Sequence, residues 1–412
     1  MYRQRLVDTE LVARLQRVGA VLIEGPKACG KTSTGRRHAA SEVILDVSYA
    51  TLPIQLALEG ERPRLIDEWQ IVPSIWNLIR HEVDKAPAKG QFILTGSARP
   101  ADDVTRHSGA GRFSRLRMRT MSMVESGHST GTISLSHLAS GNSIDSIPGS
   151  DDMDILLDAL CRGGWPMNLD LSRSDGMLSV RDYVEEVSRG DVILVSDRQR
   201  KRDPRKVRSL LTSLARSVGA PLSANTIAKD IVHHGTAMSD DTVREYLDAL
   251  DAVMLIDRIP AWTPHIRSRA SIRSQRKVYL ADPSLALAVL NVQEHQIFND
   301  LGFLGIVFEN LVIRDLLVYA QHMDAQVSYY RDSNGLEVDA ILEYPNGTWS
   351  AIEIKLSPRA IDIAAATLLK FSENINTEKN GAPSSLIIIT GSGPAYRRDD
   401  GIYVVPITML GS

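Results

Sequence analysis

The run Gly-Pro-Lys-Ala-Cys-Gly-Lys-Thr at residues 25–32 constrains the fold of this 412-residue chain more than any other feature. It fits the pattern G-x-x-x-x-G-K-[ST], and it follows the apolar residues 20–24, which are typical of a buried strand. The glycines let the backbone curl so that successive N–H groups point inward, and a helix from Lys31 would add its positive end. The alternative is a plain glycine-rich turn, but the flanking strand and helix favour an anion-binding loop.

A loop of this pattern holds the phosphates of a nucleoside triphosphate. We expect Lys31 to reach the β- and γ-phosphates of ATP and to act in catalysis, and Thr32 to offer its hydroxyl group to Mg²⁺. The residues predicted to bind ATP or ADP are Gly25, Pro26, Lys27, Ala28, Cys29, Gly30, Lys31, Thr32 and Ser33. The predicted cofactors are therefore ATP and Mg²⁺.

Strands and helices are predicted to alternate through the first part of the chain. The predicted strands are residues 20–24, 43–47, 64–68 and 91–95, and the predicted helices are residues 52–58, 75–83 and a helix from Lys31. Such alternation indicates an α/β fold with a mostly parallel sheet covered on both faces. Residues 126–152 are rich in Ser, Gly, Thr and His, so they are predicted to be a loop or weak structure at a domain edge. We place the first domain at residues 1–150.

Two carboxylates are predicted to lie beside the phosphate loop. Asp67 and Glu68 end a buried strand, and ligands of open α/β sheets bind at that end. Adjacent carboxylates there are costly to desolvate unless something compensates, and Mg²⁺ would compensate Asp67. Glu68 could then polarise the attacking water as a general base. The alternative, an ordinary pair of acids at a strand end, would be favoured if no phosphate loop preceded it.

Two further polar features could complete the phosphate site. Residues 95–97, Thr-Gly-Ser, end the next strand and could sense the γ-phosphate, although a simple turn is equally compatible with them. Arg112 is our candidate for an arginine that reaches the γ-phosphate, either of its own subunit or of a neighbour. It precedes Arg115, Arg117 and Arg119, and the alternative is a solvated strand face of alternating arginines.

The rest of the chain divides into two predicted parts. Residues 206–218, 227–232 and a helix capped by Ser239 precede a strand at residues 255–260, and together they resemble a winged-helix module in a domain at residues 151–273. A third domain, residues 274–412, is predicted to hold a long helix and several strands. Its helix covers residues 303–319, and its strands cover residues 327–331, 337–343, 349–355 and 385–390.

The third domain contains a second candidate site. The two-residue period of a strand places Asp339 on one face, and Glu353 and Lys355 share a face of the following strand. If the two strands are neighbours, the carboxylates suit Mg²⁺ or Mn²⁺ and the lysine can orient a water molecule, so all three are candidate catalytic residues. Glu309, on the long helix, could complete the metal site. The alternative is a polar outer face with a Glu–Lys pair, which spacing alone favours.

Several short motifs resemble a family of prokaryotic AAA-type P-loop ATPases over nearly the whole chain. They are DEWQ (67–70), FILTGSA (92–98), RGGWP (162–166), FEN (308–310), EVD (337–339) and EIK (353–355). The C-terminal half of that family is a domain of unknown function that is similar to PD-(D/E)xK nucleases. The resemblance implies an AAA-type ATPase domain and a C-terminal restriction-endonuclease-like α/β domain, which can lose catalysis and keep its shape.

AAA-type ATPases commonly form rings, so the resemblance also implies a homo-oligomer in which an arginine acts on the neighbouring subunit. The chain departs from the family at residues 119–122. They read Arg-Thr-Met-Ser, where the usual segment after the Gly-Arg pair ends in Pro-Leu-Ser. This departure bears on Arg112, because that residue belongs to the Gly-Arg pair.

Charge and composition bear on partners and location. The net charge of −3 predicts no general attraction to nucleic acid, so any binding would depend on local basic clusters. The first cluster is Arg198, Arg200, Lys201, Arg202, Arg205, Lys206 and Arg208, and the second is Arg267, Arg269, Arg273, Arg276 and Lys277. A solvated linker explains each cluster equally well. Two distant cysteines and the absence of an apolar run long enough to span a membrane predict a cytoplasmic protein without membrane contact.

Three functional hypotheses share the ATP site. The first is an ATPase coupled to a metal-dependent nuclease that acts on nucleic acid. The second is an ATP-driven switch whose nuclease-like domain is catalytically inactive and binds nucleic acid or protein. The third is a regulatory nucleotide-binding protein that hydrolyses ATP slowly.

Overall fold

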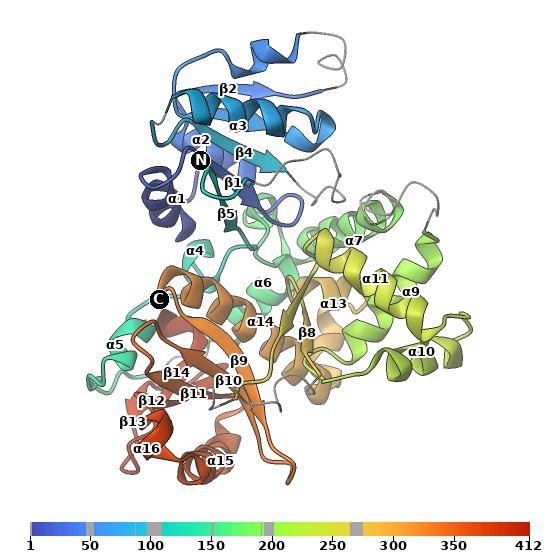
Figure 1. Cartoon of the computed structure of the whole chain (residues 1–412). Coiled ribbons are helices and arrows are strands. Elements are labelled where there is room, and N and C mark those ends of the chain that lie inside the picture. Colours follow the sequence, from blue (N-terminus) through green and yellow to red (C-terminus); the bar gives the residue numbers. More distant parts are fainter. Residues whose placement is uncertain are drawn as a thin grey trace.

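The computed structural model describes residues 2–46, 53–86, 88–96, 109–149, 152–190, 192, 202–263 and 275–412. Figure 1 shows three lobes: an N-terminal domain at the top, a helical segment at one side and a C-terminal sheet below. The three lobes follow one another along the chain, with one exception. Short elements that come directly after the first domain pack against the C-terminal lobe.

The N-terminal domain is built on a five-stranded parallel sheet in the order β2-β3-β4-β1-β5. The strands are β1 (Ala20–Glu24), β2 (Ser41–Ile44), β3 (Arg64–Asp67), β4 (Phe92–Gly96) and β5 (Phe113–Arg117). The helices are α1 (Val7–Leu15), α2 (Lys31–His38), α3 (Ile75–Lys85) and the short η2 (Ile54–Leu58) and η3 (Trp69–Ile71). The prediction of a parallel α/β sheet is confirmed. Strand β2 begins two residues earlier than predicted and ends at Ile44; residues 47–52 lie outside the described residues.

Helices cover both faces of this sheet because successive strand residues point to opposite sides. One core packs against α3 and contains Leu22, Ile66, Leu94, Trp76 and Ile79. The other packs against α1 and the phosphate loop and contains Val21, Ile23, Leu65, Ile93, Leu11 and Cys29. The three central strands, β1, β3 and β4, are therefore buried along their whole length, as expected for a parallel sheet covered on two sides, whereas the edge strands β2 and β5 are partly exposed.

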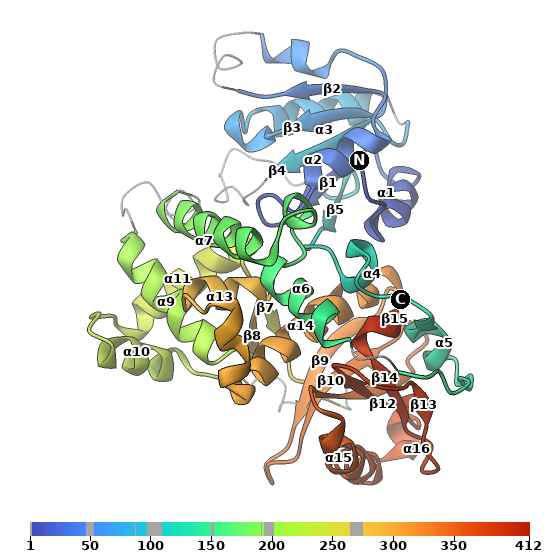
Figure 2. The same cartoon turned by 180° about the vertical axis from the view of Figure 1, so that it is seen from behind.

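The stretch that follows β5 crosses to the C-terminal lobe. It forms α4 (Met123–Ser126), β6 (Ile133–Ser134) and α5 (Leu135–Ala139). Strand β6 pairs in parallel with β15 (Leu410–Gly411), and Figure 2 shows the C-terminal end of the chain beside α4 and α5. The pairing of β6 was not predicted from the sequence, because its partner strand lies nearly 280 residues away.

The helical segment packs around one large apolar core. Its elements are α6 (Met153–Arg162), η4 (Pro166–Asn168), α7 (Arg173–Arg189), α9 (Pro204–Arg216), α10 (Ala224–His233), α11 (Asp240–Ala252), β7 (Ile256–Ile259), β8 (Lys277–Leu280) and α13 (Ser284–Val289). Helices α9, α10 and α11 precede an antiparallel β7–β8 pair. Ser239 caps α11 through the N–H group of Thr242, as its position predicts.

The C-terminal lobe is a six-stranded mixed sheet in the order β13-β14-β12-β11-β10-β9. The strands are β9 (Gln326–Arg331), β10 (Glu337–Glu343), β11 (Trp349–Lys355), β12 (Ser385–Thr390), β13 (Tyr396–Arg397) and β14 (Tyr403–Pro406). The helices are α14 (Leu301–His322), α15 (Ile361–Asn374), α16 (Thr377–Asn380) and the short η5 (Glu294–Asn299), η6 (Pro358–Ala360) and η7 (Ile407–Met409). Helix α14 joins the core of the helical segment, whereas α15 covers the opposite face of the sheet.

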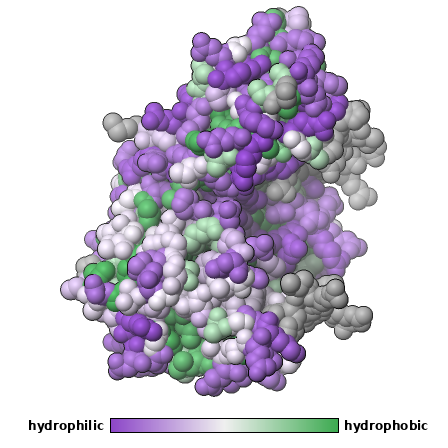
Figure 3. All heavy atoms as spheres, turned by 60° about the vertical axis from the view of Figure 1, so that its left-hand side comes forward, coloured by the Kyte–Doolittle hydropathy of each residue, from purple (hydrophilic) through white to green (hydrophobic). Residues whose placement is uncertain are grey.

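The surface of the N-terminal domain is mostly hydrophilic on the face drawn in Figure 3, and apolar side chains gather there only in small patches. Among the residues that the structure describes, no helix has the length and apolar character needed to cross a bilayer.

Candidate functional site

The phosphate loop joins the C-terminal end of β1 to the first turn of α2, as the sequence predicts. Two of its residues, Ala28 (φ 61°) and Gly30 (φ 104°), have left-handed backbone conformations. A Cβ atom at Gly25 would lie 2.1 Å from the carbonyl oxygen of Met118, so only glycine fits where the loop passes the end of β5. The loop is thus held against the sheet, with the N-terminus of α2 facing its centre.

Lys31 is buried and folds back over the loop. Its Nζ atom donates hydrogen bonds to the carbonyl oxygens of Gly25, at 2.9 Å, and Pro26, at 2.8 Å. These contacts keep the ammonium group above the turn that would hold the phosphates. No carboxylate partner is among the contacts described for this side chain, and its role toward the phosphates stays a prediction.

The carboxylate of Asp67 accepts several hydrogen bonds beside the loop. Its Oδ1 atom accepts hydrogen bonds from Thr32 Oγ1 at 3.1 Å, from the Glu68 N–H group at 3.1 Å and from Thr95 Oγ1. The pairing of β3 with β4 places Asp67 opposite Thr95 at the carboxyl ends of neighbouring strands. Hydroxyl and carboxylate oxygens are the ligands that Mg²⁺ prefers, so Thr32 and Asp67 fit the predicted ion.

Glu68 has a backbone conformation that is rare for a residue with a side chain. Its φ is 56° and its ψ is 38°, and it begins the short turn η3. Its carboxylate accepts a hydrogen bond from the side-chain amide of Gln70. A left-handed non-glycine residue stores strain that often accompanies a functional site, and the role of Glu68 as a general base stays a prediction. Of residues 95–97, Ser97 lies outside the described residues.

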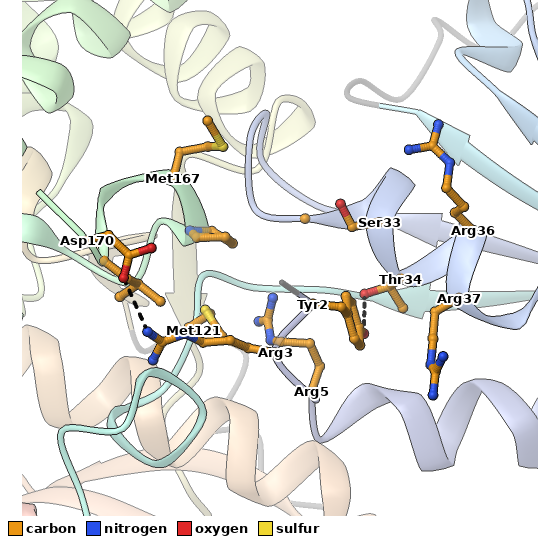
Figure 4. A pocket seen from close by; sticks show the side chains of 13 residues that line it. Tyr2, Arg3, Arg5, Ser33, Thr34, Arg36, Arg37, Met121, Met167 and Asp170 are labelled. Atoms are coloured by element: carbon orange, nitrogen blue, oxygen red, sulfur yellow. Dashed lines mark hydrogen bonds and ion pairs between the residues drawn. The ribbon is translucent and has the colours of Figure 1, made fainter.

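A cavity of about 610 Å³ opens beside the phosphate loop (Figure 4). One side is formed by α2, the opposite side by the loop after α6, and the floor by the N-terminal segment. Its lining residues include Tyr2, Arg3, Ser33, Arg36, Met167 and Asp170. Tyr2 bonds to Thr34 at 3.0 Å, and Arg3 approaches Asp170 at 3.6 Å across the opening. The cavity continues the phosphate loop and has the size of a nucleoside site.

Arg5 ties the N-terminal segment to the phosphate loop. Its guanidinium group donates to the carbonyl oxygens of Cys29 and Arg119, each at 2.9 Å, and lies 3.1 Å from a carboxylate oxygen of Glu125. All of these groups are buried or nearly so, and charged hydrogen bonds of this kind are strong. Sequence reasoning missed Tyr2, Arg3 and Arg5, because no local pattern connects the first residues of the chain with the loop.

Arg112 lies far from the predicted nucleotide site of its own chain, which contradicts a role at the phosphates of its own subunit; a role at the site of a neighbouring subunit stays a prediction. It directly precedes β5, and its carbonyl oxygen accepts the N–H group of Ala20 at the beginning of β1. The phosphate loop follows the other end of β1, roughly 13 Å away along the strand. Its exposed guanidinium group pairs with Asp84 at 2.7 Å, and this pairing raises the pKa of Arg112 and lowers that of Asp84.

We expect Arg112→Ala to leave the affinity for ATP unchanged within about twofold, because the side chain does not reach the phosphates of its own subunit. Titration calorimetry at several protein concentrations measures the affinity, and phosphate release at the same concentrations measures hydrolysis. A loss of hydrolysis that appears only when the protein is concentrated would place Arg112 in the site of a neighbouring subunit. Weaker ATP binding by a dilute monomeric variant would contradict the placement described here.

The carboxylates of the second candidate site do converge. Lys355 Nζ lies 2.6 Å from Glu353 Oε2 and 3.2 Å from Asp339 Oδ2, and the N–H group of Ile354 donates to the same Asp339 oxygen at 2.8 Å. Burial, together with the charge of Asp339, raises the pKa of Glu353 to about 8 and that of Glu309 to about 7. Burial lowers the pKa of Lys355, but the two carboxylates outweigh it and raise that pKa overall.

Lys277 and Tyr279 of β8 complete this cluster from the helical segment. Lys277 Nζ lies 2.6 Å from Glu337 Oε1 and 3.8 Å from Glu309 Oε1, and Tyr279 donates its hydroxyl proton to Glu309 at 2.7 Å. We had placed Lys277 in a basic cluster that could contact nucleic acid. That assignment was wrong, because the side chain is 3% exposed and surrounded by carboxylates. Its position at the start of an apolar strand was the available signal of burial.

Lysines occupy the positions closest to these carboxylates in the conformation observed. Within the described parts of the chain, no three or more His, Cys, Asp or Glu side chains are grouped so that they could hold a metal ion. The predicted ligands Glu309, Asp339 and Glu353 therefore do not form a metal site as they stand. A divalent cation would first have to displace Lys355 from between two of them.

The basic clusters are partly outside the described residues. Those members are Arg198, Arg200, Lys201, Arg267, Arg269 and Arg273. Of the others, Arg202 lies 3.7 Å from Glu245 and Arg208 lies 3.7 Å from Glu185. These ion pairs reduce the positive charge that the first cluster could offer to phosphates.

The chain is similar to several known families and proteins. Residues 18–126 match the family model of an AAA domain, residues 153–296 match a domain of unknown function (DUF8612), and residues 304–410 match another domain of unknown function (DUF4143). Two uncharacterized proteins, from Mycobacterium bovis and Mycobacterium tuberculosis, are each 25% identical over 366 residues, which cover 86% of this chain and 74% of each relative. The structure of a Walker-type ATPase of Pyrococcus abyssi aligns with 69% of this chain and 94% of its own, with a TM-score of 0.39 and 13% identity.

The match at residues 18–126 confirms the prediction of an AAA-type P-loop ATPase domain at the level of the family. The C-terminal match confirms a domain of unknown function, and the likeness of that domain to nucleases stays a prediction.

Proposed function

We propose that this chain is a magnesium-dependent ATPase, and one observation carries the proposal. The hydroxyl group of Thr32, at the start of α2, lies 3.1 Å from the carboxylate of Asp67, at the end of β3. The two oxygen atoms, one from the phosphate loop and one from an acidic strand end, are thus close enough to bind the same ion. This arrangement supports nucleoside triphosphate chemistry more than anion binding alone.

The residues around the loop have separate roles in this proposal. Backbone N–H groups and Lys31 bind the phosphates, and Asp67 and Thr32 would hold Mg²⁺. Magnesium, when bound, supplies positive charge to the phosphate oxygens. Glu68 accepts the proton of the attacking water, and Thr95 and the Glu68 N–H group orient the Asp67 carboxylate.

The adjoining cavity suits the nucleoside part of ATP. Met167, Leu169 and Pro166 offer an apolar wall against which a purine ring could lie, and Arg3 and Asp170 lie at its edge. We infer that the base and ribose enter between α2 and the loop after α6. Titration calorimetry with ATP and ADP, followed by a phosphate-release assay with and without Mg²⁺, tests the proposal. Failure of the folded protein to bind either nucleotide at millimolar concentration would overturn it.

A second function is proposed for the C-terminal domain, which we suggest binds or cleaves nucleic acid. The observation that supports it is the order α14-β9-β10-β11-η6-α15-α16-β12, with Glu309, Asp339, Glu353 and Lys355 on its first helix and two adjacent strands. The lysine contacts described above favour the alternative of a catalytically inactive domain in an ATP-driven switch. An active nuclease should cleave nucleic acid at a measurable rate, whereas the inactive domain should not.

If the intact protein cleaves DNA or RNA in the presence of Mn²⁺, we expect Asp339→Asn and Lys355→Met each to lower cleavage at least about 100-fold. Both changes remove charge from the same cluster, whereas Glu343→Gln, at the exposed end of β10, provides a matched control. Incubation with plasmid DNA and single-stranded RNA measures the effect. Undiminished cleavage by both variants would assign the activity elsewhere, and no cleavage by the wild type would favour the switch.

A further inference from the structure

The wall of the nucleotide cavity opposite α2 does not belong to the N-terminal domain. It is the loop of residues 163–170, which connects α6 to α7 and contributes Pro166, Met167, Leu169 and Asp170 to the cavity. Figure 4 shows Met167 and Asp170 facing the cavity from the side opposite Ser33 and Arg36. The position of this loop therefore decides the width of the space into which a nucleoside would fit.

Three hydrogen bonds fix the first half of this loop. The N–H group of Gly164 donates to Asp282 Oδ2 at 2.8 Å, and its carbonyl oxygen accepts the N–H group of Met121 at 2.7 Å. The indole Nε1 of Trp165 donates to the hydroxyl oxygen of Ser284 at 3.0 Å. All of these groups are buried, so water does not compete for the bonds.

The backbone passes these partners without room for a side chain. A Cβ atom at Gly163 would lie 2.4 Å from Ser284 Oγ, and the φ of that residue is 66°. A Cβ atom at Gly164 would lie 2.2 Å from the carbonyl oxygen of Met121. The pair of glycines in the RGGWP motif is thus required for close approach to the beginning of α13 and to the segment after β5.

The partners of the loop belong to a buried charged network. Arg314, on α14, lies 3.1 Å from Asp282 and 2.7 Å from Asp315, and the exposed fractions of these three side chains are 2%, 0% and 0%. Ser284 donates to Asp282 Oδ1 at 2.6 Å, and Asp315 Oδ2 accepts the N–H group of Met123 at 2.8 Å. A buried network of this kind holds its side chains in one arrangement. Removal of any one partner would leave another buried polar or charged group without a hydrogen bond, which is costly.

We propose that Asp282, Ser284 and Arg314 are positioning residues for nucleotide binding. They act through Gly164 and Trp165, which hold the loop 163–170 at the distance from α2 that leaves room for a nucleoside in the cavity. This inference rests on the proposed ATP site. It also connects that site with the C-terminal cluster, because α14 carries both Arg314 and Glu309.

Two mild substitutions test the proposal. Ser284→Ala removes the acceptor for the indole of Trp165, and Trp165→Phe removes the donor and keeps an aromatic ring in the core. We expect each to raise the Kd for ADP and the KM for ATP by about five- to tenfold, with kcat at saturating ATP unchanged within about twofold, because the loop contacts nucleoside rather than phosphate. Titration calorimetry and steady-state phosphate release provide these values.

Ser350→Ala is the matched control. This buried serine of β11 also bonds to two side chains, Tyr344 and Ser385, but it lies outside the loop and its network. It should lower the melting temperature by a similar amount without changing the Kd for ADP. Unchanged Kd values in both loop variants would overturn the inference. Failure of the wild-type protein to bind ADP would instead overturn the proposed ATP site, so the two failures are distinguishable.

Discussion

Replacing Lys31 with alanine is expected to lower the rate of ATP hydrolysis by about 100-fold or more. The side chain is buried, and its Nζ atom is held within 2.9 Å of two carbonyl oxygens of the phosphate loop. We expect its ammonium group to contact the β- and γ-phosphates, and removal of one such preorganised group typically has an effect of this size. Phosphate release at saturating ATP and Mg²⁺ measures the change.

Lys89→Ala serves as the control for this substitution. Lys89 is an exposed lysine in the turn before β4, at the edge of the sheet opposite the phosphate loop. Its loss should leave the rate unchanged. Hydrolysis by Lys31→Ala at the wild-type rate would mean that the loop does not bind the phosphates in the way proposed. A wild-type rate that is already very slow would support the third hypothesis, a regulatory nucleotide-binding protein.

Replacing Glu68 with glutamine is expected to lower kcat by about 100-fold while ATP still binds with nearly unchanged affinity. Glutamine has the shape of glutamate but cannot accept the proton of the attacking water, and general-base catalysis typically contributes this much or more. A KM or Kd that stays within about threefold separates this role from phosphate binding. Single-turnover hydrolysis together with titration calorimetry gives both values.

Glu68→Gly separates the carboxylate from the backbone. Because Glu68 has a left-handed conformation, glycine should relieve strain, and we expect a gain of about 1 kcal/mol in the free energy of unfolding with hydrolysis still lost. Full activity in either variant would exclude Glu68 as the general base. An active glycine variant together with an inactive glutamine variant would instead indicate that the amide of glutamine disturbs the site.

The local parts of the fold and of the site could be predicted from the sequence. The strand Ala20–Glu24 and the helix from Lys31 follow directly from an apolar run and a glycine-rich loop, since both signals lie within a dozen residues. The meeting of Thr32 with Asp67 could also be foreseen. Parallel strands place their carboxyl ends at one edge, so a residue after β1 and a residue at the end of β3 become neighbours.

Features that depend on distant partners could not be predicted in this way. Lys277 is charged and follows other basic residues, so its sequence suggested an exposed position, and only packing against Glu309 and Glu337 buries it. The distance of Arg112 from the phosphate loop of its own chain could not be predicted for a similar reason. Strand β5 returns beside β1 in parallel, and a pattern of alternating arginines does not reveal which end of the strand lies near the loop.

The apolar core that α14 shares with the helical segment constrains how this protein could evolve. Residues from α6, α9, α11 and α13 pack in one cluster with α14 and with strands of the C-terminal sheet. Cutting the chain near residue 300 would separate the helical segment from the C-terminal lobe. Each piece would then expose a large apolar surface to water. The helical segment and the C-terminal lobe are therefore expected to be inherited together in related proteins. The N-terminal domain has two apolar cores of its own, so recombination could exchange it more freely.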